Sequence, residues 1–275
     1  MSDAAPTATP LYHLYFDDSG SRMLNRLAVD ADEYPQWFAL AGLLVKEEDE
    51  AACKAAHAAF YARWPKMTAP LHLTDMHSQS DEFRWLRSLS PADQQAFWDD
   101  YHGVIVGLPV VGHGCVVHRP GYRDRNYGSR AGDQKWNLCR TAFNILVERS
   151  AKIAHSEGRR LRVRFEGADI KSDQLLKGYW ALLKAGRGLG FNADNSAKYA
   201  PFSADDLAAT LIDLERKDKK SKLMQFADTY ALAIAKGRYQ PHYTTYAALN
   251  DARKLADHYV GADRAAQEGI KFYCF

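Results

Sequence analysis

The sequence predicts an α/β protein with a five-stranded mixed sheet flanked by helices. An aromatic, apolar run without turn residues at 11–16, and a run at 37–45 that is apolar on both faces, are typical of strands. Longer segments, such as 136–155 and 223–237, repeat apolar residues at helical spacing. Strand and helix patterns alternate and no linker-like stretch interrupts them, so we expect a single domain over residues 11–275.

The composition limits the class of protein. Of the 275 residues, 47% are hydrophobic and 12% aromatic, which is enough to fill a sizeable core. Lys and Arg number 36 against 34 for Asp and Glu, so the net charge of +2 does not by itself indicate a nucleic-acid partner. Any basic binding surface must therefore be local.

The cysteines and the N-terminal segment indicate a cytoplasmic protein. The four cysteines are scattered and form no C-x-x-C pair, as expected of reduced, buried thiols. No apolar run approaches the roughly 20 residues needed to span a membrane. Residues 1–10 are small and polar, lack the apolar core of a signal peptide, and are expected to form a disordered tail.

The first half of the chain predicts three strands and a helical insertion. The strands are expected at 11–16, 37–45 and near 110–117. Glutamates open a helix directly after the second strand, and Ser90-Pro91-Ala92-Asp93 is a capping box that starts another. The helical insertion between the second and third strands is therefore expected over about 47–103.

The second half adds two strands between helices. Residues 161–166 alternate apolar and charged side chains, as in a strand with one polar face. Residues 210–214 are expected to form the fifth strand, with a short helix capped by Ser203 and Asp206 as the alternative. Helices are expected over 136–155, 172–183, 223–237 and 246–260.

Two carboxylates and a turn end the first strand, in Asp17-Asp18-Ser19-Gly20. Carboxylates at a strand end are held by the sheet yet face solvent, where they can handle a metal ion or a proton. The structural alternative is an Asp-rich turn, since Asp, Ser and Gly are ordinary turn residues. On this stretch alone both interpretations stay open.

Two further carboxylates fall at informative points. Glu166 ends the fourth strand, and Asp228 lies on the helix that follows the fifth. Asp is a poor residue for a helix interior, and its neighbours Ala227, Tyr230 and Ala231 belong to the packed side. A carboxylate at the edge of a buried face needs a partner, and a cation is one solution.

The motifs of the chain resemble the domain of unknown function 3800 family, which opens with Tyr-x-Asp-Glu-Ser-Gly and closes with a Gln-x-Ala-Asp helix. The matching segments, in order, are Tyr15-Phe16-Asp17-Asp18-Ser19-Gly20, Phe38-Ala39-Leu40-Ala41-Gly42, Phe165-Glu166 with Asp173 shortly after, and Met224-Gln225-Phe226-Ala227-Asp228. The resemblance spans residues 12–237, and His72 resembles a His that recurs after the first helix of the family. Asp18 stands where the family usually has Glu, and Arg162 and Arg164 share the face of Glu166.

The resemblance implies a ribonuclease H-like fold and a nuclease that hydrolyses phosphodiester bonds with Mg²⁺ or Mn²⁺. Two such ions activate a water and relieve charge on the leaving oxygen, and they prefer oxygen ligands. Asp17, Glu166 and Asp228 are then the expected ligands, with Asp18 and Asp173 as second choices.

His72 would serve as a proton shuttle or phosphate contact, and a structural or surface His is its equal alternative. A transition-metal site at His72, Asp75 and His77 is weaker, because the spacing does not place two His on one helical turn. The alternative function is a catalytically inactive nucleic-acid-binding or complex-forming protein on the same fold.

Two local segments suit nucleic acid. The long loop 118–135 carries Arg123, Arg125 and Tyr127, and this mixture of Arg and aromatic residues favours phosphate contact with base stacking. A basic run with Lys219, Lys220 and Lys222 leads into the helix of Asp228. The alternative for both segments is a solvated charged surface, and DNA and RNA are equally open.

Overall fold

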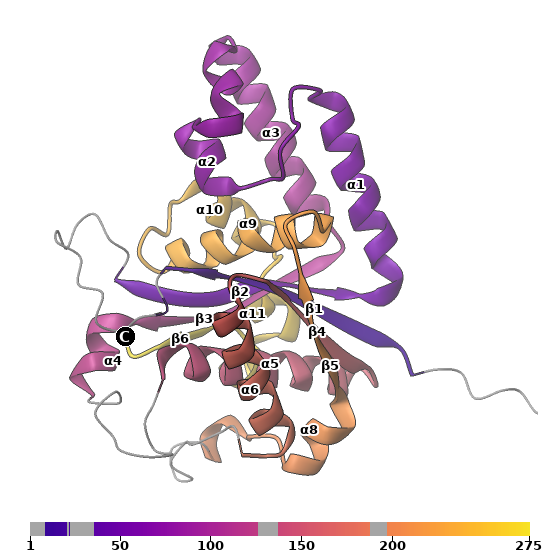
Figure 1. Ribbon diagram of the computed structural model, residues 1–275, viewed down its shortest axis with the longest axis vertical. Coiled ribbons are helices and arrows are strands. Elements are labelled where there is room, and N and C mark those ends of the chain that lie inside the picture. Colours follow the sequence, from indigo (N-terminus) through magenta and orange to yellow (C-terminus); the bar gives the residue numbers. More distant parts are fainter. Residues whose placement is uncertain (1–8, 21, 23–35, 126–136, 188–196) are drawn as a thin grey trace, which may run out of the picture.

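The computed structural model describes residues 9–20, 22, 36–125, 137–187 and 197–275 (Figure 1). Most of the expected tail and the loop residue Tyr127 lie outside the described residues. The strands are β1 (Leu11–Ser19), β2 (Trp37–Lys46), β3 (Val110–His118), β4 (Arg160–Glu166), β5 (Leu211–Lys217) and β6 (Lys271–Tyr273). The α-helices are α1 (Glu50–Arg63), α2 (Leu73–Ser78), α3 (Pro91–Gly107), α4 (Arg119–Asp124), α5 (Leu138–Ser156), α6 (Ile170–Lys184), α8 (Ala204–Thr210), α9 (Lys222–Gly237), α10 (Thr244–Asp251), α11 (Ala256–Val260) and α12 (Ala262–Glu268). Short 3₁₀ helices are η1 (Glu47–Asp49), η2 (Asp81–Ser88) and η5 (Ala197–Tyr199).

The described strands form one mixed sheet in the order β5-β4-β1-β2-β3-β6. Strand β2 is antiparallel to both β1 and β3, whereas β1 and β4, β4 and β5, and β3 and β6 are parallel pairs. The prediction of five strands was wrong by one, since β6 joins the edge beside β3. A strand of three residues is too short to show a period in the sequence.

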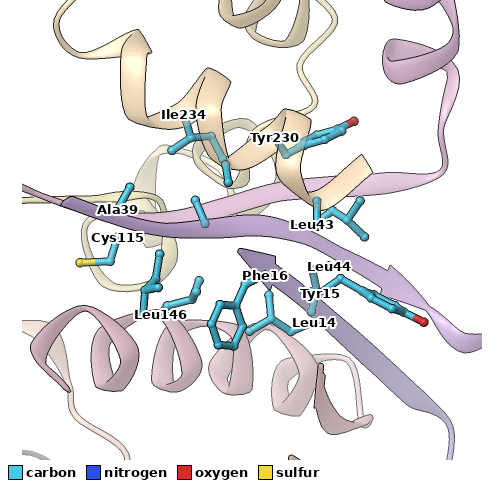
Figure 2. Close-up of a cluster of buried hydrophobic side chains, with 14 of the residues drawn as sticks. Leu14, Tyr15, Phe16, Ala39, Leu43, Leu44, Cys115, Leu146, Tyr230 and Ile234 are labelled. Carbon is cyan, nitrogen blue, oxygen red and sulfur yellow. The ribbon is translucent and has the colours of Figure 1, made fainter. Parts of the chain in front are cut away.

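Helices cover both faces of the sheet (Figure 1). Helix α9 lies across β1, β2 and β3 on one face, and α5 packs against β1 to β4 on the other. Figure 2 shows Leu14 and Phe16 pointing toward Leu146 of α5, while Tyr230 and Ile234 of α9 cover the opposite face. Each fully buried side chain of this size contributes roughly 1.5–3 kcal/mol to folding.

The arginines on the charged face of β4 pair with neighbouring acidic residues. The Arg162 Nε donates to Asp213 of β5 at 2.8 Å, and the Arg164 Nε donates to Glu215 at 3.0 Å. Arg164 also donates to Glu50 at the start of α1. A strand near the middle of the sheet thus carries arginines because carboxylates from β5 and α1 meet them.

The helical insertion between β2 and β3 stands above α9 at the top of Figure 1. It consists of η1, α1, α2, η2 and α3, and it runs to Gly107, four residues beyond the expected 103. Ser90 caps α3 as expected, its hydroxyl oxygen accepting from the backbone N–H of Asp93. Part of the expected loop 118–135 instead forms α4.

Two local predictions in the second half were incomplete. Both alternatives at 203–214 occur: Ser203 and Asp206 form a capping box at the start of α8, and β5 follows immediately. The expected helix 246–260 is broken into α10 and α11, with Arg253 between them at a φ of 57°. Among the described residues, no helix combines the length and apolarity needed to cross a lipid bilayer.

Gly42 lets β2 approach β1 next to the end that carries Asp17. It lies opposite Phe16, and a Cβ there would meet the Tyr15 carbonyl and lie 2.8 Å from the Phe16 Cα. We expect Gly42→Ala to destabilise the protein by about 2–4 kcal/mol, measured by denaturant unfolding, because backbone cannot move aside. The control is Gly103→Ala in α3, where nothing lies within 4 Å and a gain of about 0.5–1 kcal/mol is expected. Equal effects of the two substitutions would contradict this packing argument.

Candidate active site

Three carboxylates predicted from the sequence come together at the end of the sheet where β1 and β4 finish. Phe16 and Phe165 are partners in the parallel β1–β4 pair, so the residues that follow them, Asp17 and Glu166, lie side by side near the carboxyl ends of adjacent strands. The predicted turn at Asp17 was wrong, because β1 continues through Asp17 and Asp18 to Ser19, paired with β2. Asp228 comes from α9, which packs across β1. The carboxyl ends of two parallel strands and one turn of a helix therefore meet.

The electrostatics of Asp17 report this convergence. Burial, followed by repulsion from Glu166, Asp228 and Asp18, raises the pKa of Asp17 well above its ordinary value. A shift of this direction means that ionised Asp17 is unfavourable in the folded protein unless a cation is near. Strongly perturbed carboxylates of this kind are concentrated at functional sites.

Asp228 also holds the start of α2 in place. Its Oδ2 accepts a hydrogen bond from the backbone N–H of Leu73 at 3.0 Å, which fixes the start of α2 against α9. Burial raises the pKa of Asp228, and the Leu73 N–H, His72 and Lys219 act in the opposite direction. A carboxylate on the packed side of a helix is thus held by one donor and faced by two basic side chains.

His72 faces the carboxylates from the segment that precedes α2. Its Nδ1 lies 2.5 Å from Asp75 Oδ2, and its Nε2 lies 3.9 Å from Asp228 Oδ1. Because a carboxylate only accepts, the short contact places the hydrogen on Nδ1 and leaves Nε2 toward Asp228. Asp75 therefore orients the ring, in an arrangement known from catalytic and metal-binding histidines.

Gln225 connects the insertion to the turn before α9. Its buried Oε1 accepts from His57 Nε2 at 2.8 Å, from the Leu71 N–H at 3.0 Å and from the Tyr61 hydroxyl at 3.2 Å. Its Nε2 donates to the Lys219 carbonyl at 2.8 Å. Gln225 and Asp228 are one helical turn apart and accept from the N–H groups of Leu71 and Leu73, respectively. They therefore set the position of His72, which lies between these two residues.

The two second-choice ligands are engaged elsewhere. Asp18 pairs with Arg22, whose Nη2 lies 2.7 Å from its Oδ1. Asp173 accepts from the Ala168 N–H at 3.1 Å and from Arg216 Nε at 2.7 Å. Asp18 still adds to the repulsion on Asp17, whereas Asp173 contributes to the turn after β4.

Lys219 is a cation that faces the cluster from the turn before α9. Its Nζ lies 3.5 Å from Glu166 Oε1. Burial alone would lower the pKa of Lys219, but the charges of Glu166, Asp228 and Asp17 raise it above its ordinary value. Lys220, also predicted to contact nucleic acid, is exposed, and Lys222 opens α9.

The donor chemistry of the cluster fits a hard divalent cation, but the arrangement is not closed around one. Carboxylate oxygens are the ligands that Mg²⁺ and Mn²⁺ prefer. Within the ranges that the structure describes, no three His, Cys, Asp or Glu side chains stand close enough to hold one metal ion as arranged.

The described part of the basic segment predicted at 118–135, residues 118–125, lies at the same end of the sheet. Strands β1 and β3 run parallel because both are antiparallel to β2, so α4, which follows β3, is at the edge where β1 ends (Figure 1). Arg123 and Arg125 are exposed there. Tyr127 is outside the described residues.

The chain is similar to the uncharacterized protein y4pM of Sinorhizobium fredii (strain NBRC 101917 / NGR234). The two are 32% identical over 217 residues, which cover 77% of each chain. At this identity and coverage the chain belongs to the same family as y4pM. No family model matches the chain, and no solved structure matches it.

Sequence reasoning missed the supporting residues of the site. Asp75 orients His72, and His57 holds Gln225, but neither was assigned such a part. The spacing of three between His72 and Asp75 was a usable signal, because residues so spaced are neighbours on a helical turn. The contact between His57 and Gln225 joins residues 168 positions apart, and no local pattern indicates it.

Replacing Gln225 tests whether it holds the insertion in place. We expect Gln225→Leu to lower the free energy of unfolding by about 2–3 kcal/mol, because the Leu71 N–H and the Lys219 carbonyl lose their buried partner. Denaturant unfolding measures the change. The control is Gln95→Leu on the exposed face of α3, expected to stay within about 0.5 kcal/mol of wild type. A Gln225 variant as stable as the control would contradict the anchoring role.

Proposed function

We propose that the protein is a divalent-metal-dependent nuclease that hydrolyses phosphodiester bonds at the cluster of Asp17, Glu166 and Asp228. The observation that carries the proposal is the convergence of these carboxylates, near the carboxyl ends of β1 and β4 and on the turn of α9 that faces them, where they repel one another. Like charges held close together raise the free energy of the folded protein, and a bound cation removes that cost. The resemblance to a family of predicted nucleases points to the same chemistry.

The three carboxylates would hold Mg²⁺ or Mn²⁺. When bound, such ions supply an activated water and charge relief on the leaving oxygen. The sheet fixes the backbones of Asp17 and Glu166, and the Leu73 N–H holds Oδ2 of Asp228. The three side chains would have to turn toward one another to share an ion, since the described side chains do not close around one.

His72 would move a proton at Nε2. Its Nδ1 is occupied by Asp75, so Nε2 is the atom available to the cluster side. About a third of the His72 side chain is exposed, which leaves access for a substrate oxygen or a water. This geometry favours the proton-shuttle interpretation of His72 over a purely structural one.

The architecture and the basic side chains support the proposal. A mixed sheet with helices on both faces and a helical insertion between β2 and β3 agrees with the proposed ribonuclease H-like fold. Arg123 and Arg125 project from the edge at which Asp17 lies, and Lys219 and Lys220 belong to the turn beside the cluster. Nucleic acid is therefore the proposed substrate.

Removing one charge from the cluster tests the catalytic assignment. We expect Asp17→Asn to abolish Mg²⁺- or Mn²⁺-dependent cleavage of single- and double-stranded DNA and RNA probes, because the variant keeps the size but not the charge of the ligand. Asp205→Asn, at an exposed position of α8, is the control and should cleave as wild type does. Full metal-dependent cleavage by Asp17→Asn would disprove the assignment.

The same variant has a stability signature without metal. Asp17 with a raised pKa keeps its proton longer in the folded state than in the unfolded state, so its contribution to stability falls as pH rises from about 4 through the raised pKa. In EDTA, Asp17→Asn should therefore match or exceed the Tm of wild type, by a margin that grows with pH. Metal should raise the Tm of wild type alone. Early unfolding of the variant would instead make Asp17 a structural residue of β1.

Replacing both exposed arginines of the α4 segment tests nucleic-acid contact. We expect Arg123→Ala/Arg125→Ala to weaken binding across sequences and to reduce the log–log salt slope by about 1.4–1.8, because each phosphate contact releases counterions. Fluorescence anisotropy over a salt series measures the slope. The control replaces Lys66 and Arg84, exposed cations of the helical insertion. An unchanged slope in the Arg123/Arg125 variant would remove this segment from the binding surface.

A further inference from the structure

The backbone of Lys219 is held by hydrogen bonds, whereas its long side chain is half exposed. It lies in the turn between β5 and α9, which is closed by the Ser221 N–H donating to the Asp218 carbonyl at 3.0 Å. The Lys219 carbonyl accepts from Gln225 Nε2 at 2.8 Å. About half of the side chain, 48%, is exposed. The ammonium can therefore change direction without any rearrangement of the turn.

The ammonium of Lys219 lies beside the carboxylate cluster. Its Nζ is 3.5 Å from Glu166 Oε1, and the charges of Asp228 and Asp17 also act on it. Lys220 of the same turn is exposed, and its backbone N–H donates to Asp218 Oδ1 at 2.9 Å. The basic run therefore directs Lys219 at the cluster and holds Lys220 outward.

A metal ion and the Lys219 ammonium would both compensate the negative charge of the carboxylate cluster. Lys219 places one positive charge 3.5 Å from Glu166 Oε1, beside the strand that carries Asp17, where a divalent ion would place two. The described His, Cys, Asp and Glu side chains do not yet close around one ion. A cation that enters the cluster must therefore compete with Lys219 for Glu166.

We propose that Lys219 is a built-in counter-ion of the carboxylate cluster, which a divalent metal displaces when it binds. The proposal rests on the proposed function and adds a regulation of that site. In the metal-free protein the ammonium balances part of the repulsion among the carboxylates. On metal binding one cation replaces another, so Lys219 weakens the affinity for metal while it stabilises the metal-free protein. The released side chain then points out of the cluster, on the turn that also carries Lys220.

The test compares Lys219→Met with wild type, using Mn²⁺ alone as the probe and no nucleic acid. Isothermal titration calorimetry should show a Kd for Mn²⁺ lower by about two- to fivefold in Lys219→Met, because no ammonium must be displaced. In EDTA the Tm of Lys219→Met should be lower than that of wild type by a few degrees. Lys219→Gln, which keeps a polar end, should change both quantities in the same direction, and Lys220→Met should change neither.

The outcomes separate this proposal from the proposed function. If wild type binds Mn²⁺ and Asp17→Asn does not, while Lys219→Met binds with unchanged or weaker affinity, the counter-ion proposal is overturned and the metal site stands. If wild type binds no Mn²⁺, both are overturned. A double-mutant cycle in EDTA gives a metal-free check: the Tm loss caused by Lys219→Met should shrink in the Asp17→Asn background, and an undiminished loss would overturn the proposal.

Discussion

Packing of apolar faces forces like charges together in this protein, and the rest of the site is arranged around that constraint. Strands β1 and β4 pair along their lengths to bury Phe16 and Phe165, so Asp17 and Glu166 must emerge side by side. Helix α9 buries Ala227, Tyr230 and Ala231 against the sheet and carries Asp228 with them. The apolar contacts are the favourable term that offsets the repulsion among the three carboxylates.

The helical insertion depends on the same helix. Gln225 and Asp228 accept from the N–H groups of Leu71 and Leu73, so the insertion is joined to α9 through buried hydrogen bonds beside the cluster. Removal of either acceptor would leave a buried donor unpaired, which costs more than an ordinary hydrogen bond contributes. One residue, Asp228, therefore couples the position of the insertion to the charge of the site. This coupling explains why an acidic side chain is kept on the packed face of a helix.

The sequence predicted the main elements because their signals are local. Strand β2 and the first part of β1 are largely apolar runs, and α5 and α9 repeat apolar residues with helical period. The missed strand, β6, has three residues, and the break between α10 and α11 rests on a single residue with positive φ. Arg162 and Arg164 fit a strand interior only because Asp213, Glu215 and Glu50 meet them, which no local pattern shows.

The sequence by itself determined which residue types stand at the strand ends and on which helical face Asp228 lies, because period and spacing are properties of neighbouring residues. Only the tertiary structure decided which carboxylates share a site. It turned Asp18 and Asp173 toward Arg22 and Arg216, and it aimed Lys219 at Glu166. The Asp173–Arg216 and Glu166–Lys219 pairings depend on the parallel pairing of β4 with β5, which joins residues far apart in the chain.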